Sequence, residues 1–219
     1  LGAPEIVAYR DGQSAERFRV YNTAQGFGLA SGSFAKSHLV PFGDYVPFQE
    51  VLRGLITFFD LPMSSSSKGS SDQPNIVAQL GDETAQIGIG ICYEIAFGDS
   101  MRIRAREADL LVTITNDTWF GASIGPHQHM QIARVRALEN GRWLVRAAND
   151  GITGIIDHNG NVRDELPQFT EGVLKGEFHT TQGRTPYNLF GNTLFFAMLI
   201  VLGVMVGLYR YKVALRVKG

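Results

Sequence analysis

The sequence predicts an α/β protein with two layers of sheet and flanking helices, followed by one membrane-spanning helix. Three observations lead to this fold class. Short apolar runs alternate with polar turns over the first 32 residues, apolar strands alternate with helical patterns after residue 92, and a charge-free apolar run lies near the carboxyl end. At 219 residues and 44% hydrophobic content, the chain can build one sizeable core.

The expected strands are short runs of apolar and β-branched residues bounded by glycine, proline or aspartate. The first two are joined by a turn at Asp11-Gly12, and the next long pair by Gly81-Asp82. The full set of predicted strands is Ile6–Tyr9, Phe18–Thr23, Phe34–Val40, Ile76–Leu80, Gln86–Ile91, Leu110–Thr115, Trp143–Ala147, Thr153–Asp157 and Gly172–Phe178.

Three segments have helical spacing: Phe48–Phe59, Ser100–Ala108 and His127–Asn140. The third is followed by Gly141, a residue that commonly ends helices. The broad apolar side of Phe48–Phe59 has two interpretations. It packs on the sheet, or it lies at a membrane surface as an arm that admits lipid.

The run from Leu189 to Tyr209 contains no charged residue and is long enough to span a bilayer as a helix. The alternative is a buried core helix. The basic tail after residue 209, with no acidic residue, favours the membrane and places the tail in the cytoplasm by the positive-inside rule. The rest of the chain is then expected on the opposite face, which in a Gram-negative bacterium is the periplasm. The chain begins with Leu1, so we expect it to be the carboxyl-terminal part of a longer protein.

The formal net charge of -1 gives no basic footprint for nucleic acid. Cys92 is the only cysteine, and it ends the apolar run Gly88–Ile91 just before a helical segment. A thiol at a strand's carboxyl end, near a helix amino terminus and a cation, is favoured as thiolate. The alternative is that Cys92 is a small core residue.

Two further segments are expected beside Cys92. Lys36 precedes the loop Pro41–Pro47, and Asn116-Asp117 follows the next apolar strand. Parallel strands place their carboxyl ends at one edge of a sheet, so Cys92 and Asn116-Asp117 are expected to face one cleft. There a thiolate can attack a carbonyl, with Lys36 and the backbone N–H of Tyr93 stabilising the oxyanion.

These motifs resemble a known family. Gly88–Glu94 resembles the nucleophile segment of the nitrilase, or carbon–nitrogen hydrolase, superfamily, whose triad runs Glu, Lys, Cys in chain order. Four other segments resemble apolipoprotein N-acyltransferases more narrowly, and together they cover nearly the whole chain: Lys36–Pro47, Asn116–Gly121, Arg136–Arg142 and Arg146–Gly151.

The resemblance implies a nitrilase-like α-β-β-α sandwich, incomplete at its amino-terminal side, over residues 1–185. A transmembrane helix at 189–209 and a basic cytoplasmic tail at 210–219 would follow. It also implies a bacterial inner-membrane acyltransferase without cofactor or metal. Its Cys92 takes a fatty acyl chain from a phospholipid, typically phosphatidylethanolamine, as a thioester. The acceptor is the amino-terminal diacylglyceryl-cysteine of an apolipoprotein.

Two departures from the family pattern stand out. The triad glutamate has no clear counterpart, since Glu5 follows a proline as the base does but lies too close to Lys36. The chain by itself is therefore expected to be inactive. The second departure is Asp44, where the family usually carries glutamate.

Further residues have two interpretations each. Glu94, two residues after Cys92, would point to the same side of an extended strand and balance charge there, or be a solvated carboxylate. Tyr93 packs in the core or shapes the acyl pocket. The i, i+2 spacing of His127 and His129 fits no metal pair, so they are expected to be structural. Four charged side chains are expected to form ion pairs rather than bind substrate: Arg136, Glu139, Arg142 and Arg146.

Two other functions remain open. The first is a nitrilase-type amidase that hydrolyses a small amide, with water as the second nucleophile. The second is a non-catalytic, membrane-anchored binding domain.

Overall fold

The computed structural model describes residues 1–10, 16–45, 47 and 66–218. The predicted turn at Asp11-Gly12 and the predicted helix Phe48–Phe59 lie outside the described residues. Within the described ranges, ten strands form two sheets. They are β1 (Gly2–Arg10), β2 (Glu16–Gln25), β3 (Ala30–Ser31), β4 (Ser33–Ala35), β5 (Ile76–Leu80), β6 (Glu83–Ile91), β7 (Leu110–Asn116), β8 (Trp143–Asn149), β9 (Thr153–Ile156) and β10 (Val162–Leu166).

The larger sheet has seven strands in the order β10-β9-β8-β7-β6-β5-β3. Its centre, β6-β7-β8, is parallel, with Gly90 opposite Thr113 and Ile114 opposite Ala147. The outer pairs are antiparallel. The smaller sheet has the order β1-β2-β4 and is antiparallel throughout. The apolar, β-branched run of β7 predicted this central, doubly covered position.

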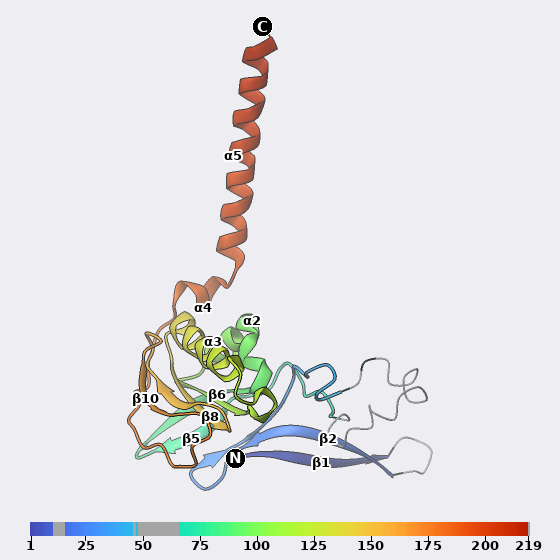
Figure 1. Cartoon of the computed structure of the whole chain (residues 1–219), viewed down its shortest axis with the longest axis vertical. Coiled ribbons are helices and arrows are strands. Elements are labelled where there is room, and N and C mark those ends of the chain that lie inside the picture. Colours follow the sequence, from blue (N-terminus) through green and yellow to red (C-terminus); the bar gives the residue numbers. More distant parts are fainter. Residues whose placement is uncertain (11–15, 46, 48–65, 219) are drawn as a thin grey trace.

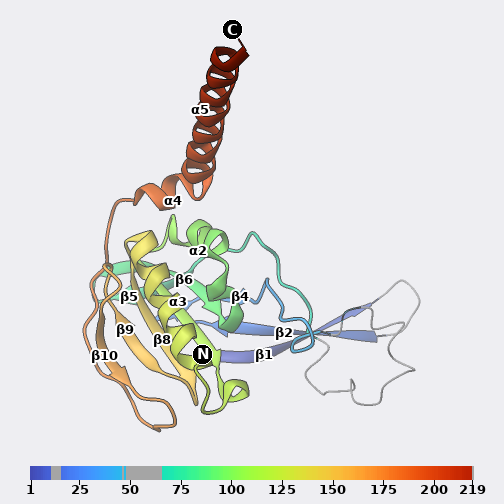
Figure 2. The ribbon, with the colours of Figure 1, turned by 45° about the horizontal axis from the view of Figure 1, so that its top comes forward.

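The helices are η2 (Cys92–Ala96), α2 (Gly98–Ala105), η3 (Thr118–Phe120), α3 (Gly125–Asn140), α4 (Pro186–Phe190) and α5 (Thr193–Lys218), of which η2 and η3 are 3-10 turns. Helices α2 and α3 cover one face of the large sheet, and the small sheet lies on the other side (Figures 1 and 2). The layers therefore run helix, sheet, sheet, as predicted for a nitrilase-like fold.

Two buried clusters hold these layers together. Between the helices and the large sheet, the side chains of Ile95, Met101 and Leu144 are fully buried. Between the two sheets, Phe34 of β4 packs with Ile89 and other residues of β6. Burial of such side chains supplies about 1.5–3 kcal/mol each and is the main force holding the layers together.

Glycines in β6 let helix α2 approach the sheet closely. A Cβ on Gly90 would lie 2.9 Å from the sulfur of Met101, and one on Gly88 would lie 3.4 Å from the carbonyl oxygen of Arg104, both residues of α2. The predicted run Gly88–Ile91 is therefore a strand with isoleucine side chains on one face and glycines on the other. Because the glycine face carries no side chains, α2 packs directly on β6.

Most predicted strands are confirmed, and two are wrong. The segment predicted as Phe34–Val40 ends its strand at Ala35, because the N–H groups of Ser37 and His38 donate to the carboxylate of Glu94 instead of a strand partner. Gly172–Phe178 is irregular. The strand next to β9 is β10, which a short turn brings back antiparallel after Asp157, while Leu174 and Phe178 pack over the apolar cluster of Trp143.

Helix α5 extends away from the sheets (Figure 1). Among the described residues, α5 is the one helix that is long and apolar enough to cross a membrane. Its candidate span is Thr193–Val213, and none of the most apolar stretch of that span is buried. Twenty-one residues at about 1.5 Å per residue reach roughly 31 Å, close to the thickness of a bilayer's hydrocarbon core. The candidate span begins after residue 189, where the membrane helix was predicted to start. Gly191, with a φ of +57°, ends the short helix α4, and α5 begins after it.

Candidate active site

Cys92 stands at the junction of β6 and η2, as the predicted strand and sharp turn require. Its φ is +52°, a left-handed conformation that side chains other than glycine rarely adopt. The thiol is free and half-buried. This turn aims the side chain out of the sheet edge, in the way strained strand-to-helix turns present nucleophiles in hydrolases. The conformation stores about 1–2 kcal/mol of strain, so neighbouring contacts must hold it.

Lys36 follows β4, and its side chain is 3% exposed. Its Nζ lies 2.6 Å from Oδ2 of Asp44, which also accepts the backbone N–H of Val40 at 2.7 Å. The other oxygen of Asp44 accepts from Asn22 at 3.1 Å. The shorter carboxylate at position 44 therefore still reaches the lysine. These contacts fix the ammonium group at the pocket wall, where Asn22, Lys36, Asp44 and Cys92 are all lining residues.

Glu94 is fully buried and joins the lysine segment to the cysteine segment. One of its oxygens accepts from the backbone N–H and hydroxyl of Ser37, both at 2.8 Å. The other accepts the backbone N–H of Ile91 at 2.9 Å. Arg104 completes the shell with an ion pair at 3.0 Å. Burial alone would raise the pKa of Glu94, but the charge of Arg104 and these hydrogen bonds lower the pKa below its ordinary value.

The predicted placement of Glu94 is wrong in one respect. The chain is not extended after Cys92, because η2 begins there, and Glu94 turns inward instead of lining the pocket with the cysteine. Tyr93 lines the pocket and is 43% exposed, which favours the pocket interpretation over core packing. Its ring meets Phe97 edge to face at 5.0 Å.

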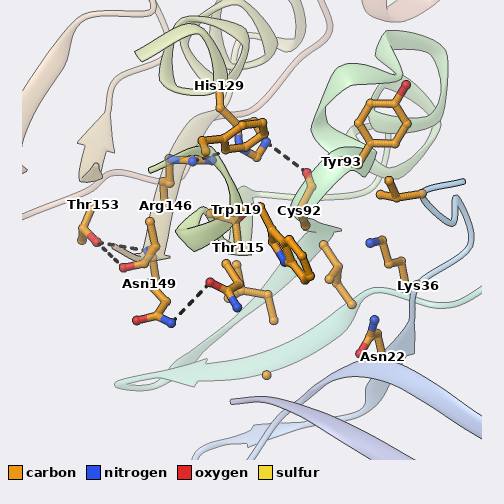
Figure 3. A pocket seen from close by; sticks show the side chains of 18 of the residues that line it. Asn22, Lys36, Cys92, Tyr93, Thr115, Trp119, His129, Arg146, Asn149 and Thr153 are labelled. Atoms are coloured by element: carbon orange, nitrogen blue, oxygen red, sulfur yellow. Dashed lines mark hydrogen bonds between the residues drawn. The ribbon is translucent and has the colours of Figure 1, made fainter. Parts of the chain in front are cut away.

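Three buried side chains, Asp117, His129 and Arg146, form a second cluster behind Cys92, here named the Asp117 cluster. His129 Nδ1 lies 2.9 Å from Oδ1 of Asp117, and Arg146 donates to Oδ2 at 2.6 Å. Nε2 of His129 lies 3.2 Å from the carbonyl oxygen of Cys92 (Figure 3). Burial raises the pKa of Asp117, but the hydrogen bond from His129 and the charge of Arg146 outweigh burial and lower it overall.

The pocket has a volume of about 1290 Å³ and a mostly apolar wall. Its polar groups lie on both sides of Cys92: Lys36 and Asn22 on one side, and Arg146, Asn149 and Thr153 on the other (Figure 3). The apolar lining comes from both sheets and the loop after β10; it includes Ala3, Ile91, Ile114, Val145, Ile155 and Leu174. Such a site can hold a long apolar group next to a nucleophile and a cation.

Of the two residues predicted to face the cleft after β7, Asn116 lines the pocket as expected. Asp117 is not a lining residue, but it contacts His129, which is one. Glu5 pairs with Tyr21 in the β1–β2 ladder and is not a lining residue. His127 is exposed. In the described part of the chain, no group of three or more His, Cys, Asp or Glu side chains could hold a metal ion.

The expected ion pairs are confirmed for Arg146 with Asp117 and for Arg136 with Glu139, which lie 2.9 Å apart. Arg142 differs, since it donates to backbone carbonyls of Ala108 and Gly183. Its burial lowers its pKa from the usual range.

The contact of His129 with Cys92 was not predicted. The sequence does contain a signal for burial, because His129 is spaced i, i+4, i+8 with Ala133 and Ala137 on one face of α3. All three are buried. A buried imidazole needs polar partners, and here they are Asp117 and the carbonyl of Cys92.

The sequence and the fold were compared with known proteins. Residues 7–185 match the model of the carbon-nitrogen hydrolase family. An apolipoprotein N-acyltransferase of Pseudomonas aeruginosa (strain PAO1) is 47% identical over 186 residues, which is 85% of this chain and 35% of the relative. Another, of Azotobacter vinelandii, is 51% identical over 169 residues, 77% of this chain and 32% of the relative. The chain thus spans about a third of the length of these relatives.

Among solved structures, a carbon-nitrogen hydrolase from Helicobacter pylori G27 is similar in fold. It has a TM-score of 0.50 and 15% sequence identity, over 68% of this chain and 53% of the other. At that identity the likeness concerns the fold alone.

Proposed function

Because this chain belongs to the carbon–nitrogen hydrolase family, we propose that Cys92 is a nucleophile that carries an acyl group as a thioester. The observation that supports this most directly is the placement of Cys92. The only cysteine stands in a left-handed turn at the end of a buried strand, in the wall of a pocket that Lys36 also lines. A lysine ammonium beside a thiol favours the thiolate, which is the attacking form.

The acyl donor in this proposal is a phospholipid, typically phosphatidylethanolamine. The Cys92 sulfur, having lost its proton to a base, attacks the ester carbonyl carbon. A C–S bond forms, the ester C–O bond breaks, and the alcohol oxygen leaves with a proton as a lysophospholipid. The names of the similar relatives, the apolar pocket wall and the candidate membrane helix α5 support a lipid donor.

The acceptor is the α-amino group of a diacylglyceryl-cysteine at the amino terminus of an apolipoprotein. It attacks the thioester carbonyl, a C–N bond forms, the C–S bond breaks, and the proton released by the amine restores the thiol. In both steps the oxyanion is stabilised by Lys36, held by Asp44, and by the backbone N–H of Tyr93. A thiolate suits this two-step transfer because it is both a good nucleophile and a good leaving group.

In this proposal α5 crosses the bacterial inner membrane and the sheets face the periplasm. The basic tail that follows the apolar run supports a cytoplasmic carboxyl end. Donor and acceptor are both held in a bilayer, so an enzyme anchored beside them does not need to extract either one into water.

The test is mass spectrometry of the full-length protein purified from membranes. An adduct of fatty-acid mass on Cys92 is expected, released by neutral hydroxylamine and missing in Cys92→Ser. His127→Gln, an exposed position on α3, is the matched control and should keep the adduct. The absence of an adduct with every phospholipid offered would contradict the proposal. Hydrolysis of small amides by detergent-free protein would favour the amidase alternative instead.

A further inference from the structure

Buried side chains hold the main chain on both sides of the Cys92 Cα atom. On the amino side, the N–H of Ile91 donates to Glu94 at 2.9 Å. On the carboxyl side, the carbonyl of Cys92 faces Nε2 of His129 at 3.2 Å. Between these two contacts the cysteine has a φ of +52°. The second contact is the one that the acyl-transfer scheme leaves unused.

The geometry points to His129 as a positioning residue that holds Cys92 in this left-handed conformation. A carbonyl oxygen can only accept a hydrogen bond, so Nε2 must carry a hydrogen to bind Cys92. On the other side of the ring, Nδ1 lies 2.9 Å from a carboxylate oxygen of Asp117. The ring is therefore held at both of its nitrogens, and Nε2 is the one that reaches the carbonyl of Cys92.

Asp117 and Arg146 hold the imidazole on its other side. Asp117 is kept ionised, and its second oxygen is bound by Arg146 at 2.6 Å. Arg146 also lies 3.2 Å from Nδ1 of His129. These contacts fix the ring so that Nε2 faces the carbonyl of Cys92.

Phe120, from η3, presents its ring edge to His129 with a centroid distance of 6.3 Å and contributes no charge. The groups that face the imidazole are then Asp117 after β7, Arg146 on β8 and Cys92 at η2. Without the His129 contact, Cys92 would relax toward a negative φ and the thiol would turn away from Lys36. The inference rests on Cys92 being the nucleophile, as proposed above.

The experiment measures the alkylation rate of Cys92 by iodoacetamide in the detergent-solubilised protein, followed by mass spectrometry of the peptide that contains it. Two variants separate the two ring nitrogens. His129→Gln places an amide N–H near the position of Nε2, and His129→Asn places one near Nδ1. Because one hydrogen bond changes an equilibrium by about threefold to tenfold, we expect His129→Asn to slow alkylation by that factor and His129→Gln to restore most of the wild-type rate.

His127→Gln, on the exposed side of the same helix, is the control and should react at the wild-type rate. Comparing the two His129 variants at matched distance below their melting temperatures removes general destabilisation from the result. If the two variants react equally fast, or if His129→Asn reacts like wild type, the positioning role is wrong.

Selective 15N-histidine labelling supplies a second readout, which a merely space-filling role would not require. Nε2 of His129 is expected to resonate as protonated, and an unprotonated Nε2 would overturn the hydrogen bond to the carbonyl of Cys92. Neither measurement uses a lipid. Failure of the acyl-transfer proposal would appear as an unmodified Cys92 in membranes, whereas failure of this one would appear as unchanged alkylation rates.

Discussion

Replacing Glu94 by glutamine should destabilise the protein strongly, because the Glu94 carboxylate is the acceptor in every hydrogen bond that it makes. Its two oxygens receive hydrogen bonds from Ser37, His38 and Ile91 and an ion pair from Arg104, and its side chain is fully buried. An amide must turn its NH2 toward one of these donors. The favourable orientation keeps the oxygen that faces Ser37 and loses the bond from Ile91.

The magnitude follows from two losses. One buried backbone N–H of Ile91 is left without an acceptor, which costs about 1–3 kcal/mol. Arg104 loses its counter-charge in a buried site, and breaking such a pair by removing one partner costs about 3–5 kcal/mol. The two losses share one site and do not add fully, so Glu94→Gln should lower the free energy of unfolding by about 3–5 kcal/mol at pH 7.

The stability difference between wild type and Glu94→Gln should depend on pH. Since folding lowers the pKa of Glu94 below its ordinary value of 4.5, the carboxylate's contribution is complete above that value and is lost as the pH falls through the lower, folded pKa. The gap in unfolding free energy between wild type and Glu94→Gln should therefore shrink on acidification. Exposed Glu83→Gln is the control and should change stability by less than about 0.5 kcal/mol.

The assay is urea unfolding of detergent-solubilised protein, followed by tryptophan fluorescence, at pH 7 and at several values below 4.5. A Glu94→Gln variant within about 1 kcal/mol of wild type at pH 7 would refute the reasoning, because a buried carboxylate with these partners cannot be so easily replaced.

Two more outcomes can be checked with the same protein. Asp44→Asn removes the charge that holds Lys36 and should slow alkylation of the active-site thiol about tenfold at a matched distance below each melting temperature, since the buried pair also contributes stability; an unchanged rate would show that another group positions the lysine. Gly90→Ala places a methyl 2.9 Å from the sulfur of Met101 and should destabilise by about 1–3 kcal/mol. Gly203→Ala, with open space around its Cβ, should not destabilise, and equal melting temperatures for the two alanine variants would count against the close packing of α2 on β6.

Much of the fold could be predicted from local patterns. The run Leu110–Thr115 is apolar on both faces, which only a central, doubly covered strand requires, and β7 occupies that position. The glycines of β6 and the end of α3 at Gly141 were also predictable, because each depends on residues that are close in sequence. Cys92 and Asn116 line one pocket, as the rule that parallel strands end at a common edge predicted. Lys36 follows β4 of the antiparallel sheet, so that rule does not place it.

What could not be predicted depends on contacts distant in sequence. The strand from Phe34 ends at Ala35 because Glu94, far along the chain, captures the next N–H groups. The turn at Cys92 is held by contacts with His129 and Glu94, which no local sequence pattern reveals. For that reason an extended chain was predicted after Cys92, and the inward direction of the Glu94 side chain was missed. The apolar segment Gly172–Phe178 packs over Trp143 without pairing, since β10 already occupies the edge of the sheet.

The link that Glu94 makes across the chain also has a kinetic consequence. Ser37 and Glu94 are separated by 57 positions, whereas β6, α2, β7, α3 and β8 contact one another over shorter loops. Contacts that close short loops form sooner than those that close long ones. The parallel centre of the large sheet should therefore assemble first and bury Glu94 beside Arg104 while the lysine segment is still unattached. In a refolding time course, protection of the Ser37 amide from hydrogen exchange should mark the last step, at which the thiol first acquires its neighbouring cation.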